Sequence, residues 1–410
     1  MITTPRIPIT ELEQSAFCQE DSQLITKPLI EELKINVNWQ EVPKQYLQLD
    51  PEIISERIFS AKSKLSTAVT ILGHHYQRDE VIQFADVTGD SFKLSQYSAR
   101  QQSKWIVFCG VRFMAETADV VSDDWQKVIL PNLAAGCSMA DMAPTEQVQD
   151  AWLDILANVG SWVDVIPVAY MNSTAEIKAL CGRNNGIICT SSNATKAFKW
   201  AMDKGNKIFF LPDQHLGRNT AKKWNIPDNE IIVWNPNKPL GGHTLEELTK
   251  ATVILWQGHC SVHTRFTTRQ IETARQKFPS VKIVVHPECT NDVVNAADRT
   301  GSTEAIINMV NNSKPKSVWA IGTEINLVNR LAKTNPDKTI FCLDSIVCPC
   351  ATMYRIHPAY LLWVLESIMY DDKKPVNIIE VDEETKYYAK RALNRMLVLW
   401  NLMMLLENTF

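Results

Sequence analysis

The chain has no surplus of basic residues, because 42 lysines and arginines stand against 46 aspartates and glutamates and give a net charge of -4. A charge balance of this kind does not indicate a nucleic-acid partner. The first residues, MITTPRIPITELEQ, also lack the basic region and the apolar core of a signal peptide. We therefore expect an ordinary globular protein of the cytoplasm.

Long apolar runs are missing as well. The most apolar tract, Met396 to Leu406, is interrupted by Asn401. It is shorter than the roughly 18 residues that suggest a membrane-spanning helix. The tract predicts a buried C-terminal helix and no membrane partner.

C-x-x-C motifs are absent, although the chain contains 10 cysteines. Structural zinc usually takes four ligands from such paired motifs, so a zinc knuckle is not expected. In a reducing compartment, spaced thiols indicate a metal or catalysis before disulfides. An iron–sulfur cluster can be held by thiolates from loops that are distant in sequence. The alternative is a set of unrelated buried cysteines, which free cysteines commonly are.

β-rich apolar runs alternate with segments of helical period along the chain, which predicts an α/β protein with parallel sheets. The runs are STAVTILGHHY, KWIVFCGV, SWVDVIPVAY, NKIFFLPD, ATVILWQGHC, VKIVVHPEC, SVWAIGTE and KTIFCLD. Most of them end in polar residues. In open α/β sheets, ligands collect at the carboxyl ends of the strands.

An internal repeat runs through the chain three times. Each copy has a strand ending in polar ring-bearing or amide residues, a Ser-containing turn before a helix, a second strand and then a cysteine. The copies contain His74, Ser91 and Cys137; Tyr170, Ser191 and Cys260; and His286, Ser302 and Cys350. A period of about one hundred residues is too long for a solenoid and fits three homologous domains.

Three domains with their strand ends at one centre would bring three thiolates to one cluster. A 4Fe-4S cluster held by three cysteines has one iron open to substrate, where it can act as a Lewis acid. The expected divisions are residues 1–60 (an extension), 61–146, 147–266 and 267–357 (three three-layer α/β/α domains in a pseudo-threefold arrangement) and 358–410 (C-terminal helices packed on the core).

Several motifs closely resemble those of the quinolinate synthase family, the A protein of NAD biosynthesis. They are GHHYQRDEVIQFADVTGDS, GCSMADM, AYMNS, CTSSNA, PDQHLGRNTA, GHCSVHTRF, HPEC, TGSTEAI and IGTEINLVNRL, and together they cover about residues 65 to 357. The resemblance implies three α/β domains around a 4Fe-4S cluster. It also implies condensation of iminoaspartate with dihydroxyacetone phosphate to quinolinate, phosphate and two waters, with a functional link to an aspartate-oxidising enzyme.

The resemblance implies that Cys137 and Cys260 are cluster ligands. The family motif has a methionine three residues after the third ligand, and Met353 stands at that distance from Cys350, which is therefore the expected ligand. Cys348 has three interpretations, which are a spectator thiol, a redox partner of Cys350 or Cys289, and the actual ligand.

Catalytic acid–base roles are expected for four residues around the open iron. The strongest candidate is Glu288, because a carboxylate beside an imidazole and a cluster can titrate near neutrality. By resemblance Tyr76 is an acid or base, and His286 and His263 assist, with His263 serving a phosphate or the ketone oxygen. A lone Tyr or His is more often a hydrogen-bonded structural residue.

Substrate carboxylates and phosphate need anchors. Ser turns at helix N-termini can bind anions, although plain N-capping explains any single one. Tyr170 and Asn172 resemble a carboxylate site, and they are equally explained as polar residues that satisfy backbone groups at a strand end. The expected substrate-binding residues are His74, Ser91, Tyr170, Asn172, Ser191, His263, His286, Glu288, Ser302 and Thr303.

Two other classes of function remain open. One is an open-iron hydro-lyase of another substrate, which would need no phosphate site. The other is a non-catalytic protein that binds a metal or a cluster, with four protein ligands. The sequence does not indicate the oligomeric state, the role of residues 1–60 or the role of Cys289.

Overall fold

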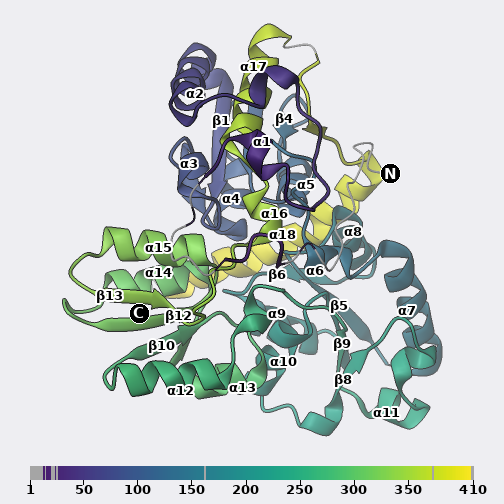
Figure 1. The fold of residues 1–410 in the computed structure, drawn as a ribbon. Coiled ribbons are helices and arrows are strands. Elements are labelled where there is room, and N and C mark those ends of the chain that lie inside the picture. The colour runs from purple at the N-terminus through teal and green to yellow at the C-terminus, as the bar shows by residue number, and fades with distance from the viewer. Residues whose placement is uncertain are drawn as a thin grey trace.

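Three separate β-sheets, each flanked by helices, form the body of the protein (Figure 1). The computed structural model describes residues 13, 15–19, 24, 26–160, 163–371 and 374–407, with side chains only as far as residue 399. The strands run parallel within each sheet, apart from one short antiparallel strand at an edge. The expected α/β class with parallel sheets is confirmed.

The first sheet has the strand order β14-β4-β3-β1-β2, the second β6-β5-β7-β9-β8 and the third β11-β10-β12-β13. Their bounds are β1 Val69–His74, β2 Val87–Gly89, β3 Trp105–Cys109, β4 Lys127–Ile129 and β14 Ile378–Ile379; β5 Val165–Tyr170, β6 Ile187–Cys189, β7 Lys207–Leu211, β8 Ile231–Trp234 and β9 Val253–Trp256; β10 Lys282–Val285, β11 Arg299–Thr300, β12 Val318–Gly322 and β13 Thr339–Cys342.

The helices lie between the strands and at both ends of the described chain. They are α1 Leu29–Glu32, α2 Pro51–Leu65, α3 Asp79–Ile82, α4 Ser91–Ser98, α5 Arg112–Val121, α6 Ser138–Asp141, α7 Thr145–Asn158, α8 Ala175–Arg183, α9 Ala194–Met202, α10 Gln214–Lys223, α11 Leu245–Lys250, α12 Thr268–Lys277, α13 Asn291–Ala296, α14 Thr303–Asn311, α15 Ile325–Thr334, α16 Ala351–Tyr354, α17 Pro358–Tyr370 and α18 Glu383–Glu407, with the 3₁₀ turn η6 at His263–Arg265.

The central strands are apolar because helices cover both of their faces. Every residue of β1, β3, β5 and β7 is buried, as expected for parallel strands inside α/β layers. Side-chain caps start several of the helices that follow strands, and they include Asp90 for α4, Thr174 for α8 and Asp213 for α10. The helices α3, α6 and α16 have no side-chain cap.

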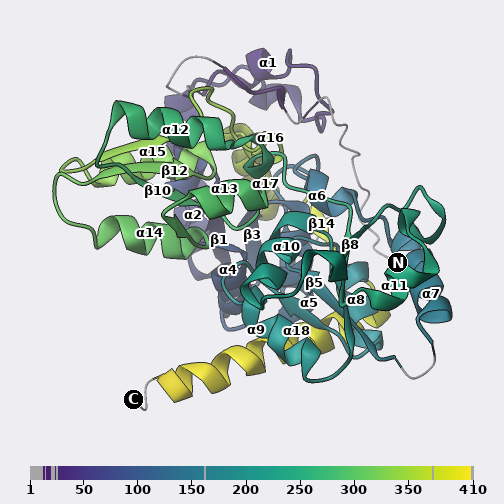
Figure 2. The same ribbon diagram turned by 90° about the horizontal axis from the view of Figure 1, so that it is seen from below.

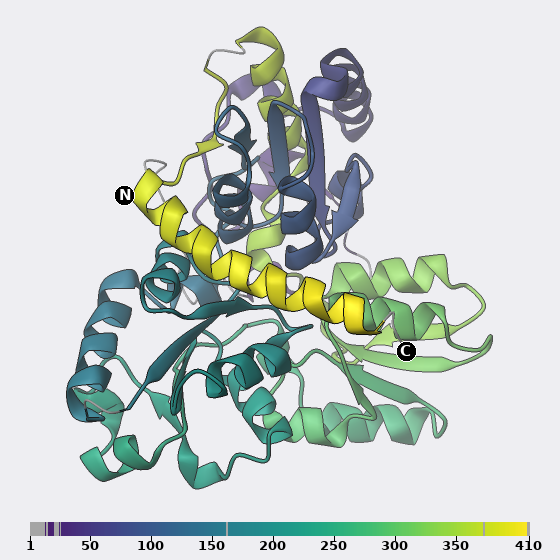
Figure 3. The same cartoon turned by 180° about the vertical axis from the view of Figure 1, so that it is seen from behind.

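The C-terminal helix α18 crosses the back of the molecule (Figure 3). It packs on α8 so closely that a Cβ at Gly182 would lie 1.8 Å from the carbonyl oxygen of Tyr388, which explains the glycine. Its last turns project from the body when seen from below (Figure 2). Met396 is buried and Val398 is exposed, while the side chains of the remaining apolar tract lie outside the described residues.

Buried ion pairs attach the N-terminal segment to the core. The guanidinium of Arg78 donates to both carboxylate oxygens of Glu32 at 2.8 and 2.9 Å, and Arg355 pairs with Glu13. All four side chains are at most 5% exposed. Among the described residues, no helix is long and apolar enough to cross a membrane.

Candidate active site

A cavity lies where the strand-end loops of the three sheets meet. All the predicted site residues except Ser302 line this cavity. The lining comprises His74, Tyr76, Asp90, Ser91, Phe92, Val111, Phe113, Met114, Cys137, Met139, Tyr170, Met171, Asn172, Thr190, Ser191, Cys260, Val262, His263, His286, Glu288, Thr303, Cys350, Thr352 and Met353. The sequence repeat therefore brings distant residues to a single place.

The three predicted ligand cysteines all line the cavity as free thiols. Cys137 and Cys350 are the residues before α6 and α16, and Cys260 follows β9. Burial raises the pKa of each thiol, and negative charge on Cys350 raises the pKa of the other two further. The thiols are thus within electrostatic reach of one another, and bare thiolates at all three would repel.

Two local features hold the cysteine loops in place. A Cβ at Gly258 would lie 2.3 Å from the carbonyl oxygen of Pro212, so only glycine allows the loop of Cys260 to pass there. Glu324, the N-cap of α15, accepts a hydrogen bond from the backbone N–H of Cys350 at 3.2 Å. No local pattern indicates the role of Glu324, because N-caps are common and its contact with Cys350 spans 26 residues.

Cys348 forms a disulfide with Cys18. This pairing differs from all three interpretations of Cys348, since the sulfur is bonded neither to Cys350 nor to Cys289 and, as a disulfide, cannot serve as a thiolate ligand. The residue lies two positions before Cys350, with Pro349 between them. The physical reason is the return of the N-terminal segment to this loop, where Gln19 and Val347 exchange backbone hydrogen bonds of 2.9 and 3.0 Å.

The same backbone turn occurs in two of the repeat copies. The Nδ1 of His74 accepts from the backbone N–H of Tyr76 at 3.1 Å, and the Nδ1 of His286 accepts from the N–H of Glu288 at 3.4 Å. Burial lowers the pKa of His74 well below its ordinary value and that of His286 to about 3. Both imidazoles are therefore neutral at pH 7.

Glu288 is almost fully buried and accepts two short hydrogen bonds. Its Oε1 accepts from the Tyr170 hydroxyl at 2.6 Å, and its Oε2 lies 2.7 Å from His263 Nδ1. Burial raises the pKa of Glu288, but His263 and His286 together with these bonds outweigh burial and hold the pKa below its ordinary value. The neighbours of Glu288 thus stabilise its carboxylate, while titration near neutrality beside a cluster stays a prediction.

Thr323 extends this network to Tyr76. Its hydroxyl lies 3.2 Å from His263 Nε2 and 3.0 Å from the Tyr76 hydroxyl, which also lies 3.2 Å from Thr303 Oγ1. Burial raises the pKa of Tyr76 well above its ordinary value. A continuous hydrogen-bonded path thus links Glu288 to Tyr76, and sequence reasoning missed its Thr323, which lies in the motif IGTE without any distinguishing feature.

The serine turns differ from one another in detail. Ser91 and Thr303 are the first residues of α4 and α14, and Ser191 lies in the turn before α9. Ser302 does not line the cavity and instead caps α14 by accepting from the N–H of Ala305. The N-capping alternative therefore accounts for the hydroxyl of Ser302.

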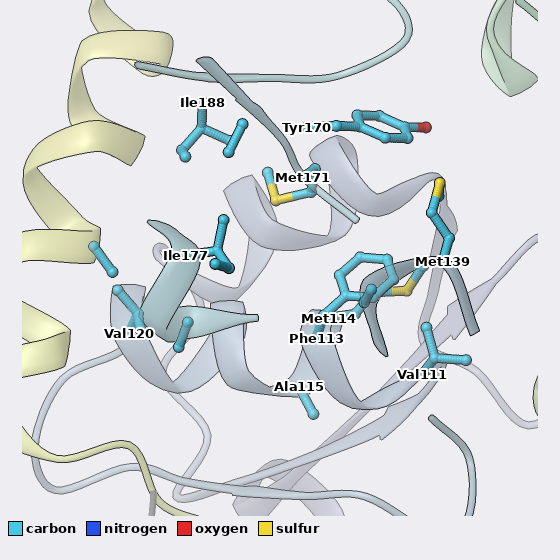
Figure 4. Packing of buried hydrophobic residues seen from close by; sticks show 14 of the residues in the cluster. Val111, Phe113, Met114, Ala115, Val120, Met139, Tyr170, Met171, Ile177 and Ile188 are labelled. Atoms are coloured by element: carbon cyan, nitrogen blue, oxygen red, sulfur yellow. The ribbon is translucent and has the colours of Figure 1, made fainter. Parts of the chain in front are cut away.

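Asn172 offers an unused polar atom to the cavity. Its Oδ1 is buried and, within the described part of the chain, has no hydrogen-bond partner. Such an atom is costly unless a ligand or water satisfies it. The opposite wall is apolar, with Val111, Phe113 and Met114 packed beside Met139 and Met171, while the Tyr170 hydroxyl points away from this packing (Figure 4).

One further combination of ligand atoms exists in the cavity. Ligand atoms of Cys260, His263 and Glu288 all lie within 4.8 Å of one another, and this group can also hold a metal ion. Both ring nitrogens of His263 already have partners in Glu288 and Thr323. The cavity thus contains two sets of residues that could bind a metal, and Cys260 belongs to both.

The chain was compared with known proteins. The family model described as quinolinate synthetase A protein, NadA, matches residues 56–398. Similar proteins named quinolinate synthase are found in Corynebacterium glutamicum, with 52% identity over 87% of this chain and 90% of that protein, and in Streptomyces coelicolor, with 54% identity over 85% and 89%. Another in Geobacillus thermodenitrificans is 50% identical over 87% and 96%. The chain therefore belongs to the quinolinate synthase family, the resemblance that its motifs indicated.

Proposed function

We propose that the protein condenses iminoaspartate with dihydroxyacetone phosphate and releases quinolinate, one phosphate and two waters, as a step of de novo NAD biosynthesis. The observation that carries this proposal is one cavity that combines three free thiols, a buried acid–base network and an unsatisfied amide oxygen. Membership of an enzyme family with this name supports it.

We propose that Cys137, Cys260 and Cys350 hold a 4Fe-4S cluster. The donor set fits, because three thiols from three loops face one cavity and need positive charge nearby to exist as thiolates. When bound, such a cluster supplies an iron without a protein ligand, which acts as a Lewis acid on a substrate oxygen. The Cys260, His263 and Glu288 group is less suited, since His263 would have to give up a partner.

The hydrogen-bonded path can remove a proton from Tyr76. The Nδ1–H of His263 donates to Glu288, which leaves Nε2 bare to accept from the Thr323 hydroxyl. Thr323 in turn can accept the phenol proton of Tyr76. Because burial and the Glu288 charge raise the pKa of Tyr76, the phenoxide would be a strong base toward a substrate proton.

Substrate anchoring is assigned to the polar edges of the cavity. Backbone N–H groups at the starts of α4 and α14, with the hydroxyls of Ser91 and Thr303, can hold carboxylate or phosphate oxygens. We assign Ser191 and the amide of Asn172 to the carboxylates of iminoaspartate. The neutral His74 and His286 would donate hydrogen bonds to substrate oxygens without adding charge.

The arrangement of the sheets supports the division into domains proposed from the repeat. Each of the ranges 61–146, 147–266 and 267–357 contains one parallel sheet, except that the edge strand β14 of the first sheet comes from the C-terminal range. Each also contributes one cavity cysteine. We propose that the three are homologous domains in a pseudo-threefold arrangement around the cluster.

Iminoaspartate is unstable in water, so an aspartate-oxidising enzyme must supply it.

We propose the cytoplasm as the location, since eight cysteines carry free thiols. The Cys18–Cys348 disulfide is the feature that speaks against a fully reducing compartment.

The decisive experiment is an anaerobic assay with dihydroxyacetone phosphate and freshly generated iminoaspartate. Quinolinate and phosphate should appear in equal amounts. A protein with a full complement of iron that forms neither product would overturn the proposal, and a dehydration without phosphate release would favour the hydro-lyase alternative. A cluster with four protein ligands would favour a non-catalytic cluster protein. So would an iron content that does not change in Cys137→Ser.

A further inference from the structure

The carbonyl oxygens of the residues before and after Asn172 accept hydrogen bonds from one side chain. The ammonium of Lys178, in α8, donates to the carbonyl oxygen of Met171 at 2.8 Å and to that of Ser173. Lys178 is fully buried and its Nζ lies 5.5 Å from the ring centroid of Phe113. Lys178 thereby holds the peptide group before Asn172 and the peptide group after Ser173.

Tyr76 is held in the same way from another sheet. Arg330, in α15 beside the third sheet, donates to the carbonyl oxygens of His75 at 2.8 Å and Gln77 at 2.7 Å, while Tyr76 belongs to the loop after β1. The Nε of Arg330 also donates to Asp79 at 3.0 Å. The planar fork of a guanidinium suits this pair of acceptors better than an ammonium would.

Glu288 is the third case. Asn219, in α10 beside the second sheet, donates through Nδ2 to the carbonyl oxygens of Pro287 and Cys289, both at 2.8 Å. Its Oδ1 accepts from Asn291 at 2.8 Å, which fixes the orientation of the amide. Asn219 is 3% exposed.

In each case the bonded carbonyls belong to the residues immediately before and after a cavity residue. The first carbonyl lies in the peptide plane that precedes the cavity residue, and the second lies in the plane beyond the next residue. Holding both planes restricts the backbone dihedral angles of the two residues between them, and so limits the direction of the Cα–Cβ bond of the cavity residue. Lys178, Asn219 and Arg330 do not themselves line the cavity. Asn219 and Arg330 each donate to a loop of a different sheet, so they also set the distance between loops of neighbouring sheets.

We propose that Lys178, Asn219 and Arg330 are positioning residues that aim Asn172, Glu288 and Tyr76 into the cavity through their flanking carbonyls. The inference rests on the proposed function, because the reaction defines what the three residues are aimed at. Its alternative is that the donors merely satisfy buried carbonyl groups, which every fold must do.

The chain contains a matched control for that alternative. Lys207 is also buried, and its ammonium donates to the carbonyl oxygens of Thr249, at 2.5 Å, and Ala251. The residue between them, Lys250, is exposed and does not line the cavity. Lys178→Met and Lys207→Met therefore remove the same kind of contact, one beside the site and one away from it.

The experiment compares these two variants with two others. Asn219→Asp keeps the shape of the side chain and removes its N–H donor. Arg330→Lys keeps the positive charge and removes the pair of N–H donors of the guanidinium. For each, kcat, KM, iron and sulfide content and thermal midpoint are measured. We expect the two lysine variants to lose similar thermal stability, while kcat falls about 10²-fold in Lys178→Met, Asn219→Asp and Arg330→Lys and stays within about twofold in Lys207→Met. Cluster content should match the parent in all four.

Amide hydrogen exchange separates this inference from the proposed function. The segments around residues 172, 288 and 76 should exchange faster in the corresponding variants, whether or not the parent makes quinolinate. A parent without activity but with these local changes would defeat only the proposed function. Unchanged exchange, or kcat losses no larger than in Lys207→Met, would overturn the positioning roles. If Lys178→Met does not fold, Lys178→Gln, which retains an N–H donor, is measured in its place.

Discussion

The Thr323 hydroxyl is the one link between His263 and Tyr76 in the described hydrogen-bonded path. Thr323→Val keeps the shape of the side chain and interrupts the path, so we expect kcat to fall about 10²-fold or more while KM changes little. Thr323→Ser restores the hydroxyl and should recover most of the rate. Steady-state kinetics of the anaerobic reaction decide, and an unchanged kcat in Thr323→Val would remove Thr323 from the path.

Lys178 gives the free energy of unfolding a specific pH dependence. Burial lowers its pKa from 10.5 to about 7, so between pH 7 and 10 the unfolded chain binds a proton that the folded protein does not. Stability contributed by this residue therefore rises with pH in that window, by up to about 1.4 kcal/mol per unit, and is constant below it.

The comparison with Lys178→Met isolates this contribution. Urea unfolding of both proteins at several pH values should give a stability difference, parent minus variant, that grows from pH 7 to 10. A difference independent of pH would show that Lys178 keeps an ordinary pKa in the folded protein. Lys207→Met serves as the matched control, because burial lowers the pKa of Lys207 too but the residue is less enclosed.

Which of these single residues could be predicted from the sequence depends on chemistry and spacing. Cys137, Cys260 and Cys350 recur in a repeat, and a thiol has few roles in a reducing compartment. Thr323 and Asn219 belong to the commonest polar types, and their partners lie at least 60 residues away. Only the folded chain shows what they contact, so no local pattern could single them out.

At the scale of elements, the loop Cys348-Pro349-Cys350 separates two kinds of sulfur. Cys350 lines the cavity as a free thiol, whereas Cys348 is bonded to Cys18. We expect Cys350→Ser to lose iron and sulfide after anaerobic purification, and Cys348→Ser to retain both. Loss of the cluster in Cys348→Ser alone would reverse this assignment, and Cys18→Ser provides the control for loss of the disulfide.

Most of the longer strands were predictable and the shortest were not. All eight β-rich runs contain strands, because their apolar residues pack between the layers, while β8, with four residues, lies outside these runs. The strands β2, β11 and β14 have only two or three residues each, too few to show any periodicity. They form because a longer neighbouring strand offers its edge, which is information from outside the segment.

At the scale of the whole molecule, the ion pair between Arg78 and Glu32 connects the N-terminal segment to the loop that follows β1. It also lies next to α16, the helix that begins after Cys350. Arg78 also donates to the carbonyl oxygen of Tyr354 and lies 3.6 Å from the centre of its ring. Glu32→Ala leaves a buried guanidinium without its carboxylate, and we expect a loss of about 3 to 5 kcal/mol in the free energy of unfolding.

Denaturant titration of the apo protein measures this loss. The double variant Glu32→Leu with Arg78→Met should recover a large part of it, since a buried apolar pair has no charge to satisfy. A loss below about 1 kcal/mol in Glu32→Ala would mean that water reaches Arg78. This attachment was not predictable, because Glu32 and Arg78 are 46 positions apart in segments of ordinary composition.

The turns at His74 and His286 decide what the cavity can offer to a substrate. Each Nδ1 accepts a backbone N–H, so in the neutral ring the only proton is on Nε2. His263 has the opposite tautomer, because its Nδ1–H faces Glu288 and its bare Nε2 faces Thr323. Two imidazoles are thereby fixed as hydrogen-bond donors and a third as an acceptor. These different roles of three histidines are set by the main chain and one carboxylate, and the lowered pKa values of His74 and His286 keep both of these rings neutral at pH 7.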